Sequence, residues 1–109
     1  MAAADTIRLV VLDRDGVINR ESPDFIRRPE DWVPLPGSIA AIADLARAGF
    51  RVAVATNQSG VGRGLFSADT LAAIHDRMTK TVEAQGGRLD GIWFCPHRPA
   101  VGCDCRKPL

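Results

Sequence analysis

A short apolar run that ends at a pair of aspartates decides how this chain folds: Leu9-Val10-Val11-Leu12-Asp13-Arg14-Asp15-Gly16-Val17. Four consecutive apolar residues that stop at a charged one are typical of a buried strand in a parallel sheet, covered on both faces. In open parallel sheets, ligands bind beyond the carboxyl ends of the strands. The two aspartates therefore stand where such a sheet places its chemistry.

The residues that follow predict a helix and then a second strand. A second apolar run, Val52–Ala55, stops at Thr56. Residues 38–49, between the two runs, carry apolar side chains at helical spacing, with Ser38 as a suitable N-cap and Gly49 as a suitable end. This is a strand–helix–strand unit, and its crossover should be right-handed.

A further helix and strand complete the pattern. Ser67 is a suitable N-cap for a helix that runs to about Gln85, and residues 91–94 read as a third strand. The proline-rich stretch 17–36 is expected to be a loop or short hairpin over the carboxyl edge of the sheet. The alternation predicts an α/β fold, an open parallel Rossmann-like sheet with helices on both faces. We expect residues 1–109 to form a single domain that is incomplete, because three strands make a thin sheet for this class.

Composition excludes several classes of function. The chain is 46% hydrophobic and 25% charged, with a formal net charge of +1. Nucleic acid and anionic membranes are poor partners for such a balanced surface, and the apolar runs are too short to span a bilayer. The N-terminus lacks the features of a signal peptide, so a cytoplasmic monomer is expected. Three clustered cysteines fit reduced, metal-binding thiols better than a disulfide scaffold.

The aspartate pair has the spacing of a two-carboxylate site. On extended chain, Asp13 and Asp15 would point to the same side, roughly 6.5–7 Å apart. One carboxylate could attack phosphorus and bind a hard cation, while the other protonates the leaving oxygen and later activates water. A simple polar turn is the alternative. A calcium loop is excluded because Val17 and Ile18 replace a required oxygen ligand and glycine.

The end of the second strand is a candidate phosphate-binding site. Thr56 and Asn57 begin a small, polar segment that reaches Gly60, and such segments can surround phosphate oxygens with donors. Arg63 follows and could reach an anionic substrate. A polar loop with a solvated arginine remains the alternative reading.

The C-terminal residues carry a candidate zinc site. Four thiol and imidazole ligands lie within eleven positions: Cys95, His97, Cys103 and Cys105. This set suits tetrahedral zinc with no open position, hence a structural ion, although unligated residues are the alternative. Arg106 and Lys107 follow directly, and a fixed loop would hold a lysine that offsets charge near phosphorus. His75 is expected to be an ordinary surface or half-buried residue.

Together these motifs resemble the haloacid dehalogenase (HAD) superfamily of phosphatases. The resemblance rests on three segments: Asp13–Asn19, Thr56–Gly60 and Cys95–Pro108. Within the superfamily, the run Gln58–Gly64 is more similar to the heptose bisphosphate phosphatase branch than to the related histidinol-phosphatase branch. The resemblance extends from about Ile7 to Leu109.

The resemblance implies a role for each residue. Asp13 would be the nucleophile that forms an aspartyl phosphate, and Asp15 the general acid and then base. Mg²⁺ would bind the Asp13 carboxylate and the Asp15 backbone carbonyl. Phosphate would be held by Thr56, Asn57 and Lys107, the rest of the substrate by Arg106 and Arg63, and zinc by Cys95, His97, Cys103 and Cys105.

The expected reaction is hydrolysis of the 7-phosphate of D-glycero-D-manno-heptose 1,7-bisphosphate, a small sugar phosphate, under a minimal cap. In that branch the product feeds the ADP-heptose precursor of the lipopolysaccharide core. Histidinol phosphate or another small phosphate ester is the alternative substrate, and a non-catalytic zinc-stabilised binding module is the alternative of another class. The superfamily's further acidic motif, which adds a Mg²⁺ ligand, has no counterpart after Lys107.

Overall fold

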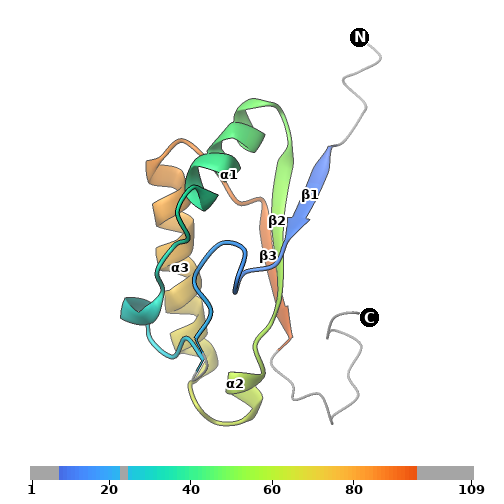
Figure 1. Cartoon of the computed structure of the whole chain (residues 1–109). Helices are drawn as coiled ribbons and strands as arrows, with labels where there is room; N and C mark the ends of the chain where they lie inside the picture. The colour runs from blue at the N-terminus through green and yellow to red at the C-terminus, as the bar shows by residue number, and fades with distance from the viewer. Residues whose placement is uncertain (1–7, 23–24, 96–109) are drawn as a thin grey trace.

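The computed structural model of the chain describes residues 8–22 and 25–95. The described elements alternate between strands and helices, which confirms the α/β class (Figure 1). In chain order they are β1 (Leu9–Leu12), the 3₁₀ turn η2 (Pro29–Asp31), α1 (Ser38–Arg47), β2 (Arg51–Asn57), α2 (Ser59–Gly62), α3 (Ala68–Ala84) and β3 (Gly91–Cys95).

The three strands form one parallel sheet in the order β1-β2-β3. Leu12 at the end of β1 pairs with Val54, and Asn57 at the end of β2 pairs with Cys95. Because all three strands run in the same direction, their carboxyl ends meet at one edge of the sheet. The polar residues after β1 and at the end of β2 are therefore brought together, as the sequence predicts.

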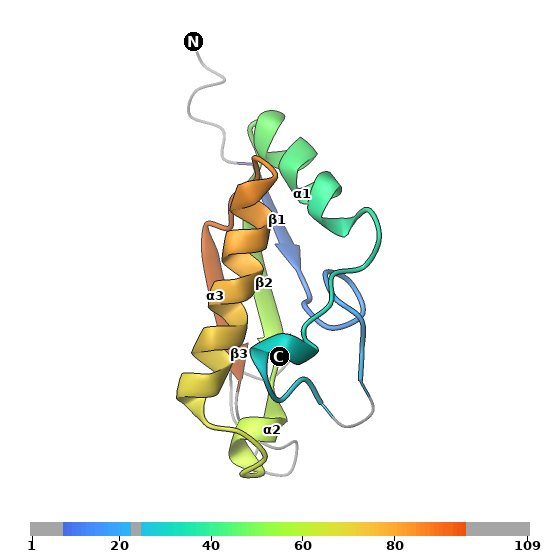
Figure 2. The same cartoon turned by 90° about the vertical axis from the view of Figure 1, so that its left-hand side faces the viewer.

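Helices α1 and α3 lie on the same face of this sheet (Figures 1 and 2). Each new strand is added on the same side of the one before it, so two right-handed crossovers place both helices on one face. Helices on both faces were expected, whereas among the described residues α1 and α3 occupy one face. With right-handed crossovers, a helix lies on the second face only where the chain adds its next strand on the opposite side, which reverses the strand order.

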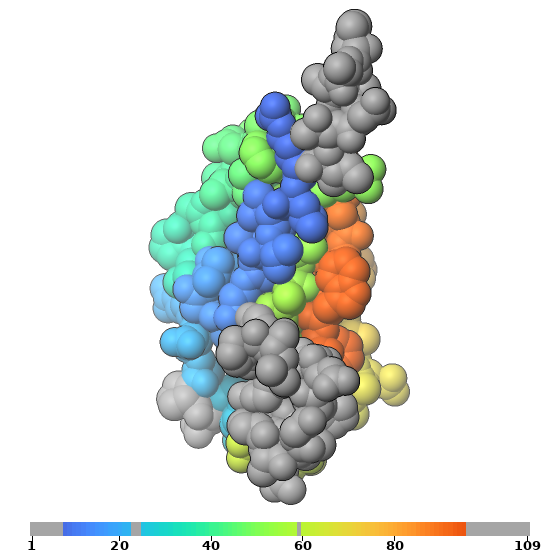
Figure 3. All heavy atoms as spheres, turned by 90° about the vertical axis from the view of Figure 1, so that its right-hand side faces the viewer, coloured from blue at the N-terminus to red at the C-terminus, as the bar shows by residue number. Residues whose placement is uncertain are grey.

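The second face of the sheet is more exposed than the sequence predicts (Figure 3). The run Leu9–Leu12 was expected to be buried on both faces, yet Leu9 is 57% and Val11 is 58% exposed. On β3, Trp93 is 63% exposed. Within the described residues, these apolar side chains have no layer above them.

The hydrophobic core lies between the sheet and the two helices, and the proline-rich loop contributes to it. Ile18, Ile26 and Trp32 from this loop join strand and helix residues in one buried cluster. Two backbone bonds of 2.9 Å, from Arg20 N–H to Val33 and from Leu35 N–H to Ile18, hold the loop ends antiparallel. The expected loop or short hairpin is thus a minimal antiparallel contact closed by η2.

The helix ends agree with the sequence in one case and differ in the other. Ser67 caps α3 by accepting the Thr70 amide at 3.0 Å, as predicted. At α1 the helix already includes Ser38, so the N-cap is Gly37, whose φ of 82° lies in the left-handed region. Ser38 is released to donate to the Val17 carbonyl at 2.7 Å, which ties the helix to the loop after β1. None of the described helices has the length and apolar composition needed to cross a bilayer.

Candidate active site at the carboxyl edge of the sheet

The chain turns sharply as soon as β1 ends. Three successive amides donate to the carbonyl oxygen of Arg14, at 2.8 to 3.2 Å: Val17, Ile18 and Asn19. Gly16 follows the aspartate pair with φ +81°, a conformation that side chains disfavour, and a Cβ there would approach Glu21 to 3.2 Å. This turn sets the direction of every polar side chain that follows β1.

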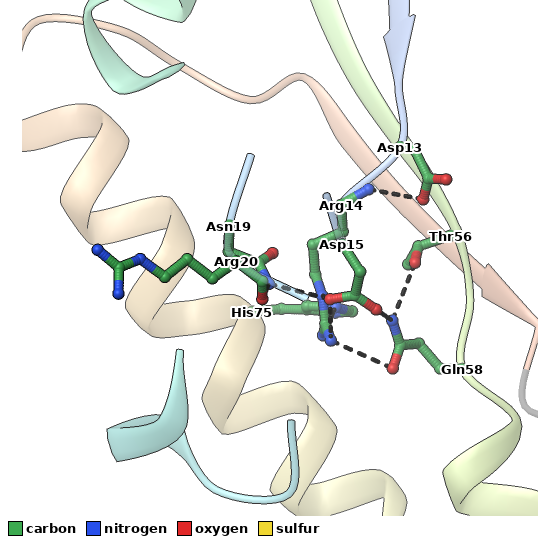
Figure 4. A network of polar contacts seen from close by, with 8 residues as sticks. All are labelled: Asp13, Arg14, Asp15, Asn19, Arg20, Thr56, Gln58 and His75. Carbon is green, nitrogen blue, oxygen red and sulfur yellow. Dashed lines mark hydrogen bonds and ion pairs between the residues drawn. The ribbon is translucent and has the colours of Figure 1, made fainter. Parts of the chain in front are cut away.

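The turn separates the two aspartates, which corrects the picture of a pair on extended chain. β1 ends at Leu12, so Asp13 and Asp15 do not share a strand face. The Asp13 side chain is exposed, and its Oδ1 accepts the Arg14 amide at 2.8 Å. The Asp15 carboxylate is turned instead toward Gln58, beside the Arg14 guanidinium (Figure 4).

Arg14 is the counter-charge of Asp15. Its side chain is fully buried, and its Nη2 lies 2.8 Å from Asp15 Oδ1. Nε donates to the same oxygen at 3.0 Å, and Asn19 Nδ2 adds a third bond at 3.0 Å. A buried charge is costly without a partner, so this ion pair fixes both side chains.

Thr56 and Gln58 link the end of β2 to this pair. Thr56 is buried, and its Oγ1 accepts a hydrogen bond from Gln58 Nε2 at 2.9 Å. The same Nε2 donates to Asp15 Oδ2 at 3.0 Å. The backbone N–H of Gln58 donates to the carbonyl oxygen of Cys95 at 2.7 Å. Gln58 thus joins all three strand ends, a role that sequence reasoning missed because glutamine is common in polar loops.

His75 brings α3 into the site, contrary to the expectation of a surface or half-buried residue. It is only 7% exposed, and its Nε2 lies 3.2 Å from Arg14 Nη1. Burial, and then the Arg14 charge, lower the pKa of His75 to about 4, against the opposing effect of Asp15. A signal existed in the sequence: His75 falls at helical spacing from Leu71 and Met78, on the buried stripe of α3.

The remaining predicted residues are only partly placed. Asn57 belongs to β2 itself, and the glycine-containing segment after it forms α2 instead of an open loop. A Cβ at Gly60 would clash with the Phe66 ring, so any larger residue there would have to displace that ring. The Arg63 guanidinium lies 6.0 Å from the centre of the Phe25 ring. Five predicted residues lie outside the described residues: His97, Cys103, Cys105, Arg106 and Lys107.

Two oxygen groups in the described residues suit a hard cation. One is the exposed Asp13 carboxylate, and the other is the Asp15 backbone carbonyl, to which no backbone amide of the described residues donates. No cluster of three or more His, Cys, Asp or Glu side chains occurs in residues 8–22 and 25–95. Among the predicted zinc ligands, Cys95 is the one that lies within the described residues, and it is buried at the end of β3.

Several known phosphatases are similar to the chain in sequence. No protein-family profile matches the chain. It is 55% identical over 102 residues to D-glycero-beta-D-manno-heptose-1,7-bisphosphate 7-phosphatase of Pseudomonas putida, covering 94% of this chain and 58% of that protein. It is 34% identical over 102 residues to the probable heptose-1,7-bisphosphate 7-phosphatase of Thermoplasma volcanium, covering 94% of this chain and 69% of that protein. The chain thus spans little more than half the length of the bacterial relative.

Solved structures share the fold. The crystal structure of D,D-heptose 1,7-bisphosphate phosphatase from Bordetella bronchiseptica, complexed with magnesium and phosphate, matches with a TM-score of 0.92 at 52% identity. That match covers 94% of this chain and 57% of the other. A protein of Mesorhizobium loti assigned as a HAD-like phosphatase matches with a TM-score of 0.76 at 34% identity, covering 91% and 46%. The predicted α/β architecture is therefore confirmed.

Acid should destabilise the fold through His75. Because its pKa falls from 6.5 to about 4 on folding, the unfolded chain binds a proton between these pH values that the folded chain does not. Stability present above pH 6.5 is lost as the pH falls toward 4, by roughly 2–3 kcal/mol at pH 4.5. Urea unfolding at pH 7.5 and pH 4.5 measures this loss. The His75→Gln variant has no titrating group at this position, so its loss of stability between the two pH values should be smaller by roughly 2–3 kcal/mol. Equal losses in the two proteins would contradict the assignment of this pH dependence to His75.

Proposed function

Since the chain belongs to the family of D-glycero-D-manno-heptose 1,7-bisphosphate 7-phosphatases within the HAD-like phosphatases, we propose that it supplies the nucleophile of such an enzyme. The proposed reaction is hydrolysis of the 7-phosphate of the heptose bisphosphate, in the supply of lipopolysaccharide core precursors. One observation carries the proposal: Asp13 presents an exposed carboxylate at the end of β1, next to an Asp15 held by a buried cation. The names of the relatives favour a heptose substrate over histidinol phosphate.

The chemistry takes place in two steps. Asp13 attacks phosphorus to form an aspartyl phosphate, and the departing sugar oxygen takes the proton of the Asp15 carboxyl group. Asp15, now a carboxylate, then takes a proton from water as the water oxygen bonds to phosphorus. The bond between Asp13 and phosphorus breaks, and phosphate leaves. The exposed side chain of Asp13 and the partly exposed one of Asp15 are both accessible for these roles.

Other residues would bind the substrate and its metal ion. Mg²⁺ would be held by the Asp13 carboxylate and the Asp15 carbonyl, and when bound it neutralises charge on the transferring phosphate. The crystal structure of the relative from Bordetella bronchiseptica is a complex with magnesium and phosphate, which supports Mg²⁺ as the metal ion but does not name its ligands. Phosphate and sugar contacts are proposed for Thr56, Asn57, Arg63, Arg106 and Lys107. The substrate is a small molecule, and we propose that the protein acts on it as a cytoplasmic monomer.

Replacing the nucleophile tests the proposal directly. Asp13→Asn removes the attacking charge with little change in shape, so turnover of heptose bisphosphate should fall by at least about three orders of magnitude. Asp44→Asn is the matched control, because Asp44 is 76% exposed on α1, remote from the strand ends. Phosphate release is measured, with thermal unfolding as the check on folding. Appreciable turnover by folded Asp13→Asn would exclude Asp13 as the nucleophile.

We propose that a further carboxylate from outside these 109 residues completes the Mg²⁺ site. Mg²⁺ usually takes one or two carboxylates together with phosphate oxygens and water. The chain alone should bind Mg²⁺ weakly and turn over heptose bisphosphate far more slowly than a chain of the relatives' length. Comparing the two chains at matched Mg²⁺ concentrations measures this difference. Equal activity would show that the 109 residues suffice.

Zinc is proposed to bind Cys95, His97, Cys103 and Cys105, on the strength of their clustering in the sequence. Protein kept under a reductant should contain about one zinc ion per chain by mass spectrometry of the metal, following the four-ligand stoichiometry of such sites. Cys103→Ser should lose the ion, whereas His75→Gln should keep it because His75 is not one of the four proposed ligands. Zinc-free reduced protein would contradict the proposal.

A further inference from the structure

The buried Arg14 side chain makes contacts with three different parts of the fold (Figure 4). Nε and Nη2 donate to Asp15 Oδ1 at 3.0 and 2.8 Å, in the turn after β1. Nη2 also donates to Gln58 Oε1 at 3.3 Å, and Nη1 donates to His75 Nε2 at 3.2 Å. A guanidinium is a rigid planar group with a fixed fork of donors. Partners on three elements therefore fix its position and orientation.

The two oxygens of Asp15 are used unequally. Oδ1 accepts three hydrogen bonds, two from Arg14 and one from Asn19, which exceeds the two lone pairs of a carboxylate oxygen. Oδ2 accepts one hydrogen bond, from Gln58 Nε2, among the contacts of the described residues. The side chain is still 31% exposed, so Oδ2 has both the capacity and the access to meet another group.

Gln58 and His75 hold the guanidinium from the other side. The two hydrogens of Gln58 Nε2 are directed to Asp15 and to Thr56 Oγ1, so Oε1 is the atom left to face Arg14. His75 must accept from Arg14 through Nε2, because arginine only donates. The ring proton of neutral His75 therefore belongs on Nδ1. The lowered pKa of His75 agrees with this neutral, accepting state.

We propose that Arg14, held by His75 and Gln58, is a positioning residue that orients Asp15 so that Oδ2 exchanges the proton with the leaving group and with water. This inference rests on the proposed function, because it assigns an acid–base role to Asp15. Arg14 is fully buried, so we assign it no contact with the substrate.

The proton is followed through both steps at one oxygen. In the first step the Oδ2–H bond breaks as the bond between phosphorus and the sugar oxygen breaks, and the proton moves to that oxygen. In the second step Oδ2 takes a proton from water as the water oxygen bonds to phosphorus and Asp13 departs. Oδ1 keeps its donors throughout, because protonating Oδ1 would sacrifice charge-assisted hydrogen bonds that are buried and cannot be replaced by water.

A purely structural role predicts something different. A buried ion pair that only stabilises the fold would, when weakened, lower stability and slow all substrates alike. A positioning role affects the step that needs proton donation. Alkoxide leaving groups need that proton, whereas 4-nitrophenolate is stable enough to leave without it. The dependence on the leaving group therefore separates the two roles.

The test compares two substitutions of His75 in the full-length, Mg²⁺-containing enzyme. His75→Leu removes the acceptor that Arg14 needs, whereas His75→Gln keeps an acceptor in a side chain of similar size. The first turnover is followed by rapid quench, because later turnovers depend on Asp15 with every substrate. For heptose bisphosphate, His75→Leu should slow the first turnover at least about tenfold, a part of the 10²–10⁴-fold effect of a general acid. In this first turnover, release of 4-nitrophenol should change less than about twofold, with the substrate concentration for half-maximal rate unchanged. His75→Gln should restore most of the rate with heptose bisphosphate.

Each outcome bears on the inference. Equal slowing of both substrates by His75→Leu, or no slowing of either, would overturn it while the proposed function stands. If the unaltered enzyme releases neither leaving group, the proposed function fails and this inference with it. Should His75→Leu not fold, Arg14→Lys keeps the charge but lacks the planar fork, and the same difference between substrates is expected.

A spectroscopic measurement tests the geometry without any substrate. Nitrogen-15 chemical shifts of His75 at pH 7 should show a neutral ring with the proton on Nδ1. A proton on Nε2 would remove the acceptor of Arg14 and overturn the inference, whatever the activity.

Discussion

The ion pair between the Arg14 guanidinium and the Asp15 carboxylate is the interaction around which the rest of the site is arranged. A guanidinium with no exposed surface is stable only when its charge is matched and its donors are satisfied. Asp15 supplies the charge, and Gln58 and His75 supply further acceptors. The turn after β1, the start of α2 and the middle of α3 must therefore meet at one point. The Asp15 carboxylate, for which we propose the acid–base role, is fixed in place by the same requirement.

The direction of the crossovers determines how the sheet presents this site. Both crossovers move the chain the same way, so one face of the sheet carries α1, α3 and the buried loop (Figures 1 and 2). That face supplies the packing that fixes Trp32 and His75 beneath the carboxyl edge. On the other face, apolar side chains such as Leu9 and Val11 remain exposed among the described residues. The chain spans little more than half the length of relatives that share this fold.

The sequence predicted the regular elements well because their signals are local. Apolar runs ending in polar residues gave β1 and β2, and the Ser67 cap gave the start of α3. Contacts between distant segments were harder to predict. The separation of Asp13 from Asp15 depends on three amides that converge on one carbonyl, and the burial of His75 depends on what lies opposite α3. The turn leaves no periodic pattern, so it required the structure. His75 does lie on the apolar stripe of α3, so its burial could have been predicted, whereas its contact with Arg14 could not.

The central claim is that the Asp13 carboxylate forms a covalent bond to phosphorus. The most direct measurement is to mix full-length, Mg²⁺-containing enzyme with substrate labelled with radioactive phosphorus at the 7-phosphate, quench it with acid within milliseconds, and map the label by peptide mass spectrometry. The account predicts an acyl phosphate on the peptide that contains Asp13, labile to hydroxylamine and absent without substrate. Turnover with no labelled protein at any time, or a label on another residue, would contradict it.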